Sequence, residues 1–159
     1  MTVVADRKVP ASYKEVSAKK LETTTEPLTV QIGGDALIAE PRPDLAGLRI
    51  TRPVVGGVYL VGPEGFLHHV PNGDTYNNLF KNWDGIFETI DQIAKGEPLT
   101  VGAILARGSG RDAVFLVSNN VKRWITSPAV MDKYYFTYKN IVQVPAILID
   151  FIPTGEPWR

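Results

Sequence analysis

Cysteine is absent from this chain of 159 residues, and histidine occurs only twice, at the neighbouring positions His68 and His69. Without cysteine the protein can form no disulfide, has no thiolate nucleophile and cannot build a cysteine zinc site. Because successive side chains of a β-strand point to opposite faces, His68 and His69 are poorly placed to bind one metal ion together. The sequence therefore nominates no metal site, no cofactor and no catalytic residue.

The chain also lacks a net charge and a long apolar run. Its 17 basic and 17 acidic residues cancel, so no net field attracts a nucleic-acid backbone or an anionic membrane. No segment approaches the roughly 20 apolar residues of a membrane-spanning helix, and charges interrupt residues 1–20, where a signal peptide needs an apolar stretch. We therefore expect no nucleic-acid binding and no membrane insertion. We expect a soluble protein that is cytoplasmic or released by a non-standard route, and its compartment stays open.

One sequence motif occurs twice in this chain. IDQIAKGEPL at 90–99 recurs as IDFIPTGEPW at 149–158, and VYLV at 58–61 recurs as VFLV at 114–117. The spacing between these anchors varies by a few residues, as surface loops allow. The pattern predicts a tandem repeat.

This repeat divides the chain into parts. Residues 1–25 are polar and predict an arm that precedes a single domain over 26–159, within which the repeats span about 40–99 and 100–159. One unit of this size would be marginally stable without a disulfide or a metal. We therefore expect the two copies to pack into one compact domain, which the apolar fraction of 44% can supply with a core.

Each repeat begins with alternating β-branched and aromatic residues, a pattern that predicts a strand, followed by a turn and a second strand. The turns, at 62–65 and 118–120, contain glycine or asparagine, which accept left-handed backbone conformations. Both repeats are therefore predicted to contain a β-hairpin. A further strand is predicted at 102–107.

Short helices are predicted after the hairpins. Ser127 and Asn72 are typical residues at a helix start, and Pro128 is favourable at the first helical position. Isoleucines at helical spacing predict another helix over 83–95, ended by Gly96.

The second repeat has a strand-like segment at 141–144 before a short helix from Pro145 to about residue 152. The predicted fold class is thus α+β and β-rich, with hairpins and short helices in two copies.

The sequence of the second predicted hairpin resembles a known repeat. AVFLVSNNVKRWITSP at 113–128 resembles a short repeat of many uncharacterised bacterial proteins, often exported or surface-associated, with the pattern Val-Tyr-Leu-Ile, turn, Lys-Arg-x-Ile, Ser-Pro. The match covers 102–155 and, more loosely, 56–99, where His68 and His69 stand in place of Lys-Arg. The resemblance implies a non-catalytic module.

An aromatic ring beside polar groups on a β-surface is a usual way to bind a sugar or a peptide. Trp124, with Arg123 and Lys122, has this composition in the second hairpin, and His68 and His69 take the equivalent positions in the first. Lys122 and Trp124 are expected on one face of the strand and Arg123 on the other. The alternative is that Trp124 caps the core while Lys122 and Arg123 form a solvated edge.

Two further aromatic residues, Tyr76 and Trp83, are added to the predicted ligand-binding surface. The alternative for both is a place in the core at the edge of a helix. The clustered carboxylates Asp84, Glu88 and Asp91 are expected on one solvated helix face, so they predict no active site.

These patterns predict a non-enzymatic, lectin-like binding module that recognises a carbohydrate or a protein surface through duplicated hairpin faces. Two other classes stay open. One is a structural or assembly subunit that forms a homo-oligomer through hairpin edges. The other is a small hydrolase or metal-dependent enzyme that uses His68 or His69.

Overall fold

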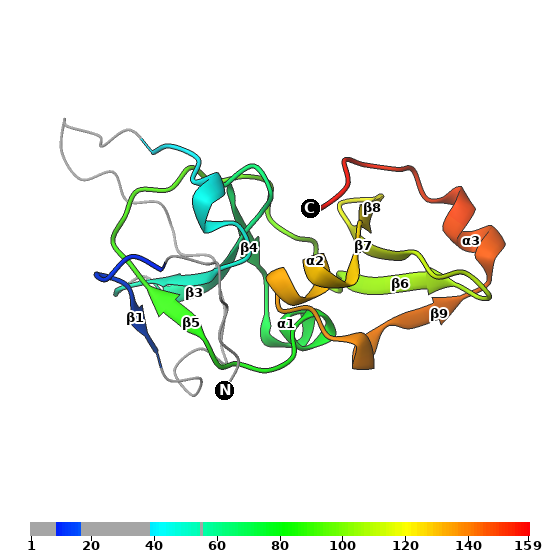
Figure 1. The fold of residues 1–159 in the computed structure, drawn as a ribbon, viewed down its shortest axis with the longest axis horizontal. Coiled ribbons are helices and arrows are strands. Elements are labelled where there is room, and N and C mark those ends of the chain that lie inside the picture. The colour runs from blue at the N-terminus through cyan, green and yellow to red at the C-terminus, as the bar shows by residue number, and fades with distance from the viewer. Residues whose placement is uncertain (1–8, 17–38, 55) are drawn as a thin grey trace.

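The computed structural model describes residues 9–16, 39–54 and 56–159, and it has an α+β fold that is rich in strands (Figure 1). Its strands form two sheets, in the orders β1-β5-β2-β3-β4 and β8-β7-β6-β9. The strands are β1 (Lys14–Glu15), β2 (Arg49–Arg52), β3 (Gly56–Val61), β4 (Leu67–Val70), β5 (Ile86–Glu88), β6 (Ile104–Gly108), β7 (Val114–Ser118), β8 (Val121–Ile125) and β9 (Val142–Val144). The predicted class, α+β and β-rich, is confirmed.

The helices are few and short: α1 (Gly73–Leu79), α2 (Pro128–Lys133) and α3 (Ala146–Phe151), with 3-10 turns at Pro43–Leu45 and Tyr138–Asn140. Of the predicted arm over 1–25, only residues 9–16 are described; the rest of the arm and residues 26–38 lie outside the described residues.

Both sheets are built around an antiparallel meander of three strands. In the first sheet the meander is β2-β3-β4, and in the second it is β6-β7-β8. Each meander leads into a helix and then into a strand that pairs in parallel with the first strand of the meander, β5 with β2 and β9 with β6. In the first sheet β1 adds a further, antiparallel strand outside β5.

The predicted hairpins and helix starts are present. Asn119 and Asn120 have φ angles of 58° and 62°, the left-handed pair that joins β7 tightly to β8. The side chain of Asn72 accepts a hydrogen bond from the N–H of Thr75 at 2.8 Å, and Ser127 caps α2 in the same manner. These local signals could be read from the sequence because they act within four residues.

The predicted helix over 83–95 is wrong. This segment contains β5, preceded by Gly85 with a φ of 76°, and continues as an extended chain. Ile86 packs in the core between the sheets, Ile93 packs on the other side of the first sheet, and Ile90 is exposed. The three isoleucines therefore face three environments, although their spacing would also suit one face of a helix.

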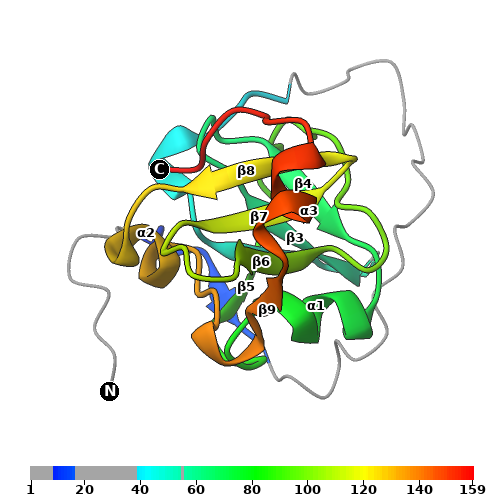
Figure 2. The ribbon, with the colours of Figure 1, turned by 90° about the vertical axis from the view of Figure 1, so that its right-hand side faces the viewer.

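The inner faces of the two sheets share one hydrophobic core, and Figures 1 and 2 show the sheets on either side of it. Leu60 from β3 and Leu116 from β7 belong to the same buried cluster. Phe80 and Phe136, which follow α1 and α2, form an isolated antiparallel bridge, and their ring centroids are 5.6 Å apart. The sheets are thus held by a common core.

The outer face of the first sheet is covered by a second cluster of buried residues. Ile50, Tyr59 and Val61 of the sheet pack under side chains from the segments that run across it, chiefly Tyr13 and Leu45. This face is closed to solvent.

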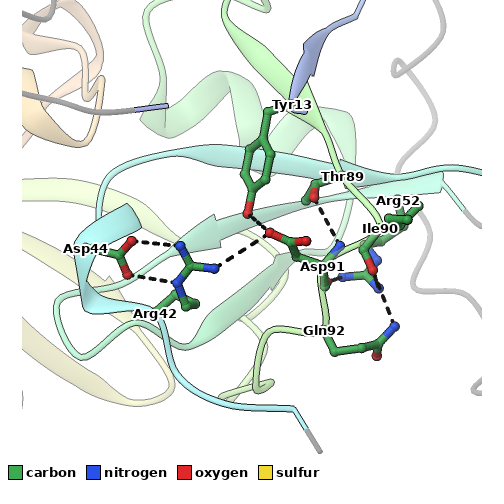
Figure 3. Close-up of polar contacts among 8 residues, drawn as sticks. All are labelled: Tyr13, Arg42, Asp44, Arg52, Thr89, Ile90, Asp91 and Gln92. Atoms are coloured by element: carbon green, nitrogen blue, oxygen red, sulfur yellow. Dashed lines mark hydrogen bonds and ion pairs between the residues drawn. The ribbon is translucent and has the colours of Figure 1, made fainter. Parts of the chain in front are cut away.

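Polar contacts centred on Asp91 fasten that cover (Figure 3). The hydroxyl of Tyr13 donates a hydrogen bond to the Asp91 carboxylate at 2.8 Å, and burial together with this bond raises the pKa of Tyr13 to about 12. Arg42 lies 3.6 Å from the same carboxylate and pairs with Asp44 at 2.8 Å. The guanidinium of Arg52 donates to the main-chain carbonyl of Asp91. Three segments far apart in sequence are thereby tied together.

The turn between β7 and β8 gives a stability prediction. Asn120 is exposed and left-handed, so Asn120→Gly should stabilise the protein by about 0.5 kcal/mol, because glycine adopts this conformation without strain. Asn120→Ala should destabilise it by about 1 kcal/mol. Urea unfolding of the three proteins measures both values, and a more stable alanine variant would contradict the left-handed turn.

Candidate functional site

The first copy of the Gly-Glu-Pro motif lies along the outer edge of β4. Leu67 donates its N–H to the carbonyl of Ala94 at 2.9 Å and accepts a hydrogen bond from the N–H of Gly96 at 2.8 Å. The outer edge of the first hairpin is therefore occupied by residues 94–99 of the same chain.

The second copy of the Gly-Glu-Pro motif lies along the outer edge of β8. Lys122 donates its N–H to the carbonyl of Pro153 at 2.8 Å and accepts from the N–H of Gly155 at 2.8 Å. Neither glycine ends a helix, which corrects the prediction for Gly96. We refer to residues 94–99 and 153–158 as the GEP segments.

His68 and Arg123 make equivalent contacts with these segments. Nδ1 of His68 lies 2.7 Å from the main-chain oxygen of Glu97, and because a carbonyl can only accept, Nδ1 carries the proton. Arg123 donates from Nη1 to the main-chain oxygen of Glu156 at 3.3 Å. Both side chains therefore contribute to holding the GEP segments.

His68 packs closely against two glycines. A Cβ atom added to Gly62 would lie 2.7 Å from Nε2 of His68, and one added to Gly96 would lie 2.9 Å from its Cε1. Arg123 leaves somewhat more room, since a Cβ on Gly155 would lie 3.0 Å from Nη1. The imidazole thus fills a slot between two glycines.

His69 points to the other face of β4 and is buried, with an exposed fraction of 5%. Its ring lies 5.3 Å from the ring of Tyr59, beneath the cover of the first sheet. The face of the first hairpin is therefore not available to a ligand, and the predicted pair of duplicated binding faces is reduced to the second hairpin.

Tyr76 is fully buried, and its hydroxyl accepts from Nη1 of Arg49 and donates to the carbonyl of Asn82, both at 2.6 Å. Burial raises the pKa of Tyr76 to about 12. Trp83 stacks on its ring with a centroid distance of 3.9 Å, and the indole N–H bonds to Asn77 at 2.8 Å. This pair lies with Arg49, apart from the second hairpin.

Lys122 is buried on the outer face of the second sheet, where its Nζ donates to the main-chain oxygen of Ile149 at 2.7 Å. The same ammonium lies 5.4 Å from the ring centre of Phe115. Lys122 therefore anchors α3 to the sheet, and the alternative that made it part of a solvated edge is wrong.

Trp124 lies on the same outer face and is exposed, with a relative accessibility of 46%. It sits directly opposite the half-buried Phe115 in the β7–β8 register. That face points away from the shared core, so Trp124 does not cap the core. Among the seven predicted ligand-binding residues, Trp124 is the one that is exposed; the other six are buried or half-buried.

Next to this strand, α3 crosses the outer face of the second sheet (Figure 2). Ile149 is buried against the sheet, while Ile147, Leu148 and Phe151 point outward with exposed fractions of 63%, 53% and 77%. Together with Trp124 we call these exposed residues the α3 surface. The only sequence signal for it is the apolar run AILI after Pro145, which resembles a core segment.

The two outer faces differ at matching register positions. Tyr59 and His69 pair across β3 and β4 and are buried, whereas Phe115 and Trp124 pair across β7 and β8 and are half-buried or exposed. The difference arises because a covering layer lies over the first sheet and only α3 lies over the second.

No cluster of three or more histidine, aspartate or glutamate side chains suited to a metal ion occurs among the described residues. Asp84, Glu88 and Asp91 do not share a helix face, because that helix is absent. In the same part of the chain, no helix has both the length and the apolar content to cross a bilayer. Comparison with family models, curated proteins and solved structures finds no significant match to this chain.

The contact between His68 and Gly62 can be tested by a double-mutant cycle. Gly62→Ala should destabilise the protein by about 1 to 3 kcal/mol, because the added methyl group overlaps the imidazole. In a His68→Ala background the same change should cost less, with a coupling of about 1 kcal/mol or more. Additive effects in urea unfolding would rule out the close contact.

Stability should also depend on the protonation of His68. Burial lowers the pKa of His68 below its ordinary value of 6.5, the charge of Arg123 lowers it further, and the bond to Glu97 opposes the shift. The unfolded chain therefore takes up this proton first, so the contribution of His68 is complete above the ordinary pKa and is lost as the pH falls.

Unfolding free energies measured from about pH 8 to about pH 5 should fall more steeply for the wild type than for His68→Asn, which keeps a hydrogen-bond donor. Parallel curves for the two proteins would show that His68 does not titrate differently on folding.

Proposed function

We propose that this protein is a non-enzymatic binding module that recognises a partner protein through the α3 surface. The observation that carries the proposal is the exposure of four large apolar side chains, Trp124 on β8 and Ile147, Leu148 and Phe151 on α3. Figure 2 shows α3 lying over the sheet that contains β8. Exposed apolar side chains that gather in this way mark interaction sites, and tryptophan often contributes most to the binding free energy.

A protein partner fits this surface better than a carbohydrate. A sugar needs polar groups beside the aromatic ring to fix its hydroxyls. The neighbouring cations are already engaged, Lys122 with the carbonyl of Ile149 and Arg123 with that of Glu156. The residue directly opposite Trp124 in the sheet is the apolar Phe115.

We also propose that the two halves of the domain are copies of one repeat. Support comes from the common strand order of the two sheets and from the equivalent contacts of His68 with Glu97 and of Arg123 with Glu156. The bridge between Phe80 and Phe136 joins residues at matching positions in the two copies. On this proposal, one copy has kept its hairpin face open while the other has had it covered.

The occupied edges bear on the assembly hypothesis. Residues 94–99 and 153–158 take the backbone positions beside β4 and β8 that another chain would need. Pairing through the hairpin edges would require these segments to leave, so a binding face is the better-supported function.

The proposal is tested by comparing the wild type with a Trp124→Ala/Phe151→Ser variant. Both side chains are exposed, so the stability should change by no more than about 0.5 kcal/mol. Proteins retained from a cell extract by the immobilised wild type should bind the variant at least about tenfold more weakly. Ile90→Ser, which removes an equally exposed apolar side chain on the first half of the chain, is the control and should bind normally.

Equal binding by the wild type and the double variant would contradict the proposal. A glycan array run with the same proteins separates the ligand classes. If glycan binding is present and is lost in Trp124→Ala, the partner is a carbohydrate and not a protein.

A further inference from the structure

Among the described residues, no strand pairs with the outer sides of two end strands, β1 in the first sheet and β9 in the second, and β1 consists of two charged residues, Lys14 and Glu15. The GEP segments cover β4 and β8, and β1 pairs with the outer side of β5. β9 is the last strand of the second sheet, and within residues 9–16, 39–54 and 56–159 no strand pairs with its outer side. Its residues, Val142, Gln143 and Val144, carry no charge that would discourage pairing.

The direction of the backbone groups on β9 follows from its contact with β6. The carbonyl of Val144 accepts a hydrogen bond from the N–H of Ser109 at 2.8 Å, so Val144 points its main-chain groups toward β6. Because these groups alternate along a strand, the N–H and the carbonyl of Gln143 point away from the sheet. Gln143 is exposed, so a further strand could reach both groups.

The first sheet contains an example of what fits such an edge. β5 and β9 hold the same place, each in parallel beside the first strand of its meander. On β5 the position outside is filled by β1, an extended antiparallel segment in which Val16 donates its N–H to the carbonyl of Ile86 at 2.9 Å. Lys14 of that segment lies opposite Glu88, so the added strand also supplies the complementary charge.

Around β9 the charge is positive. Arg107 lies directly opposite Gln143 in the sheet, and Lys139 is exposed just before the strand. Neither side chain has an ion-pair partner among the described residues. On the outer face, Val142 is exposed in the same cross-strand row as Phe115 and Trp124.

We propose that β9 is a docking site for an extended acidic segment of the partner protein, which adds to the second sheet as an antiparallel strand. Acidic side chains of this segment would face Arg107 and Lys139, and an apolar side chain would lie beside Val142 on the outer face. A second copy of this chain fits less well, because it would bring a second Arg107 and Lys139 to the same edge. The inference rests on the proposed function, since it names the way in which the partner is held.

The test uses two peptides derived from the chain's own added strand, residues 10–16. The acidic probe is PASYEEV, in which Lys14 is replaced by Glu, and the basic control is PASYKKV, in which Glu15 is replaced by Lys. With excess acidic peptide, the amide of Gln143 should exchange with solvent more slowly by roughly threefold or more, since it becomes hydrogen bonded. The basic peptide should leave this rate unchanged. Hydrogen exchange measured by NMR reads the residue directly.

Two variants sharpen the result. Lys139→Glu changes an exposed side chain and should reduce protection by the acidic peptide and allow protection by the basic one. Gln143→Pro removes the outward N–H and should abolish binding of the acidic peptide, read from the NMR shifts of the Val142 and Val144 amides because position 143 then has none. Trp124→Ala should leave the protection of Gln143 in place.

Equal protection by both peptides, or none, would overturn the docking site. So would concentration-dependent protection of Gln143 without peptide, accompanied by dimers in light scattering, because a second copy would then be the occupant. If the Trp124→Ala/Phe151→Ser variant loses the partner while Lys139→Glu and Gln143→Pro retain it, the proposed function stands and the strand addition falls.

Discussion

The packing of two small sheets against one common core is the constraint on which the rest of this structure depends. Each sheet contributes its inner face to that core, and the bridge between Phe80 and Phe136 closes it. Because both inner faces are buried in this core, the core cannot cover the outer faces or the strand edges. Each of these is either covered by another segment or exposed. A covering layer fastened around Asp91 closes the outer face of the first sheet, and the GEP segments close the edges of β4 and β8. On the second sheet Trp124, the outward side of α3 and the outer edge of β9 stay open, and the proposed partner would bind there.

The repeated motif is therefore a signature of edge protection. A Gly-Glu-Pro segment supplies a glycine that lets a bulky side chain lie close, and a carbonyl that accepts its hydrogen bond. Histidine and arginine both satisfy this arrangement, although they differ in shape and charge. The sequence similarity between the two halves of the chain thus indicates how the outer edges of β4 and β8 are covered. His69 is buried and Trp124 is exposed, although they occupy equivalent positions in the two hairpins. This difference indicates which of the two outer faces is accessible to solvent.

Features decided by near neighbours could be predicted from the sequence, and features decided by distant segments could not. The helix starts at Asn72 and Ser127 and the left-handed turn at Asn119 depend on residues within one turn of the chain. Alternation along β8 correctly placed Lys122 and Trp124 on one face. The sequence did not reveal that Tyr13 and Leu45 would join the cluster that covers the outer face of the first sheet, because these residues reach it from far away in the chain. The same limit explains the failed helix over 83–95, where spacing alone does not distinguish one apolar face from three separate contacts.

The helix α3 has only six residues, which is too short to be helical by itself in water. It exists because Lys122 bonds to the carbonyl of Ile149, and because Gly108 lets Ala146 approach the sheet closely. The arrangement of its three outward apolar side chains therefore depends on tertiary contacts and not on the local sequence alone. A synthetic copy of residues 146–151 would have the same side chains without their arrangement, so it could neither replace the protein nor compete with it for a partner.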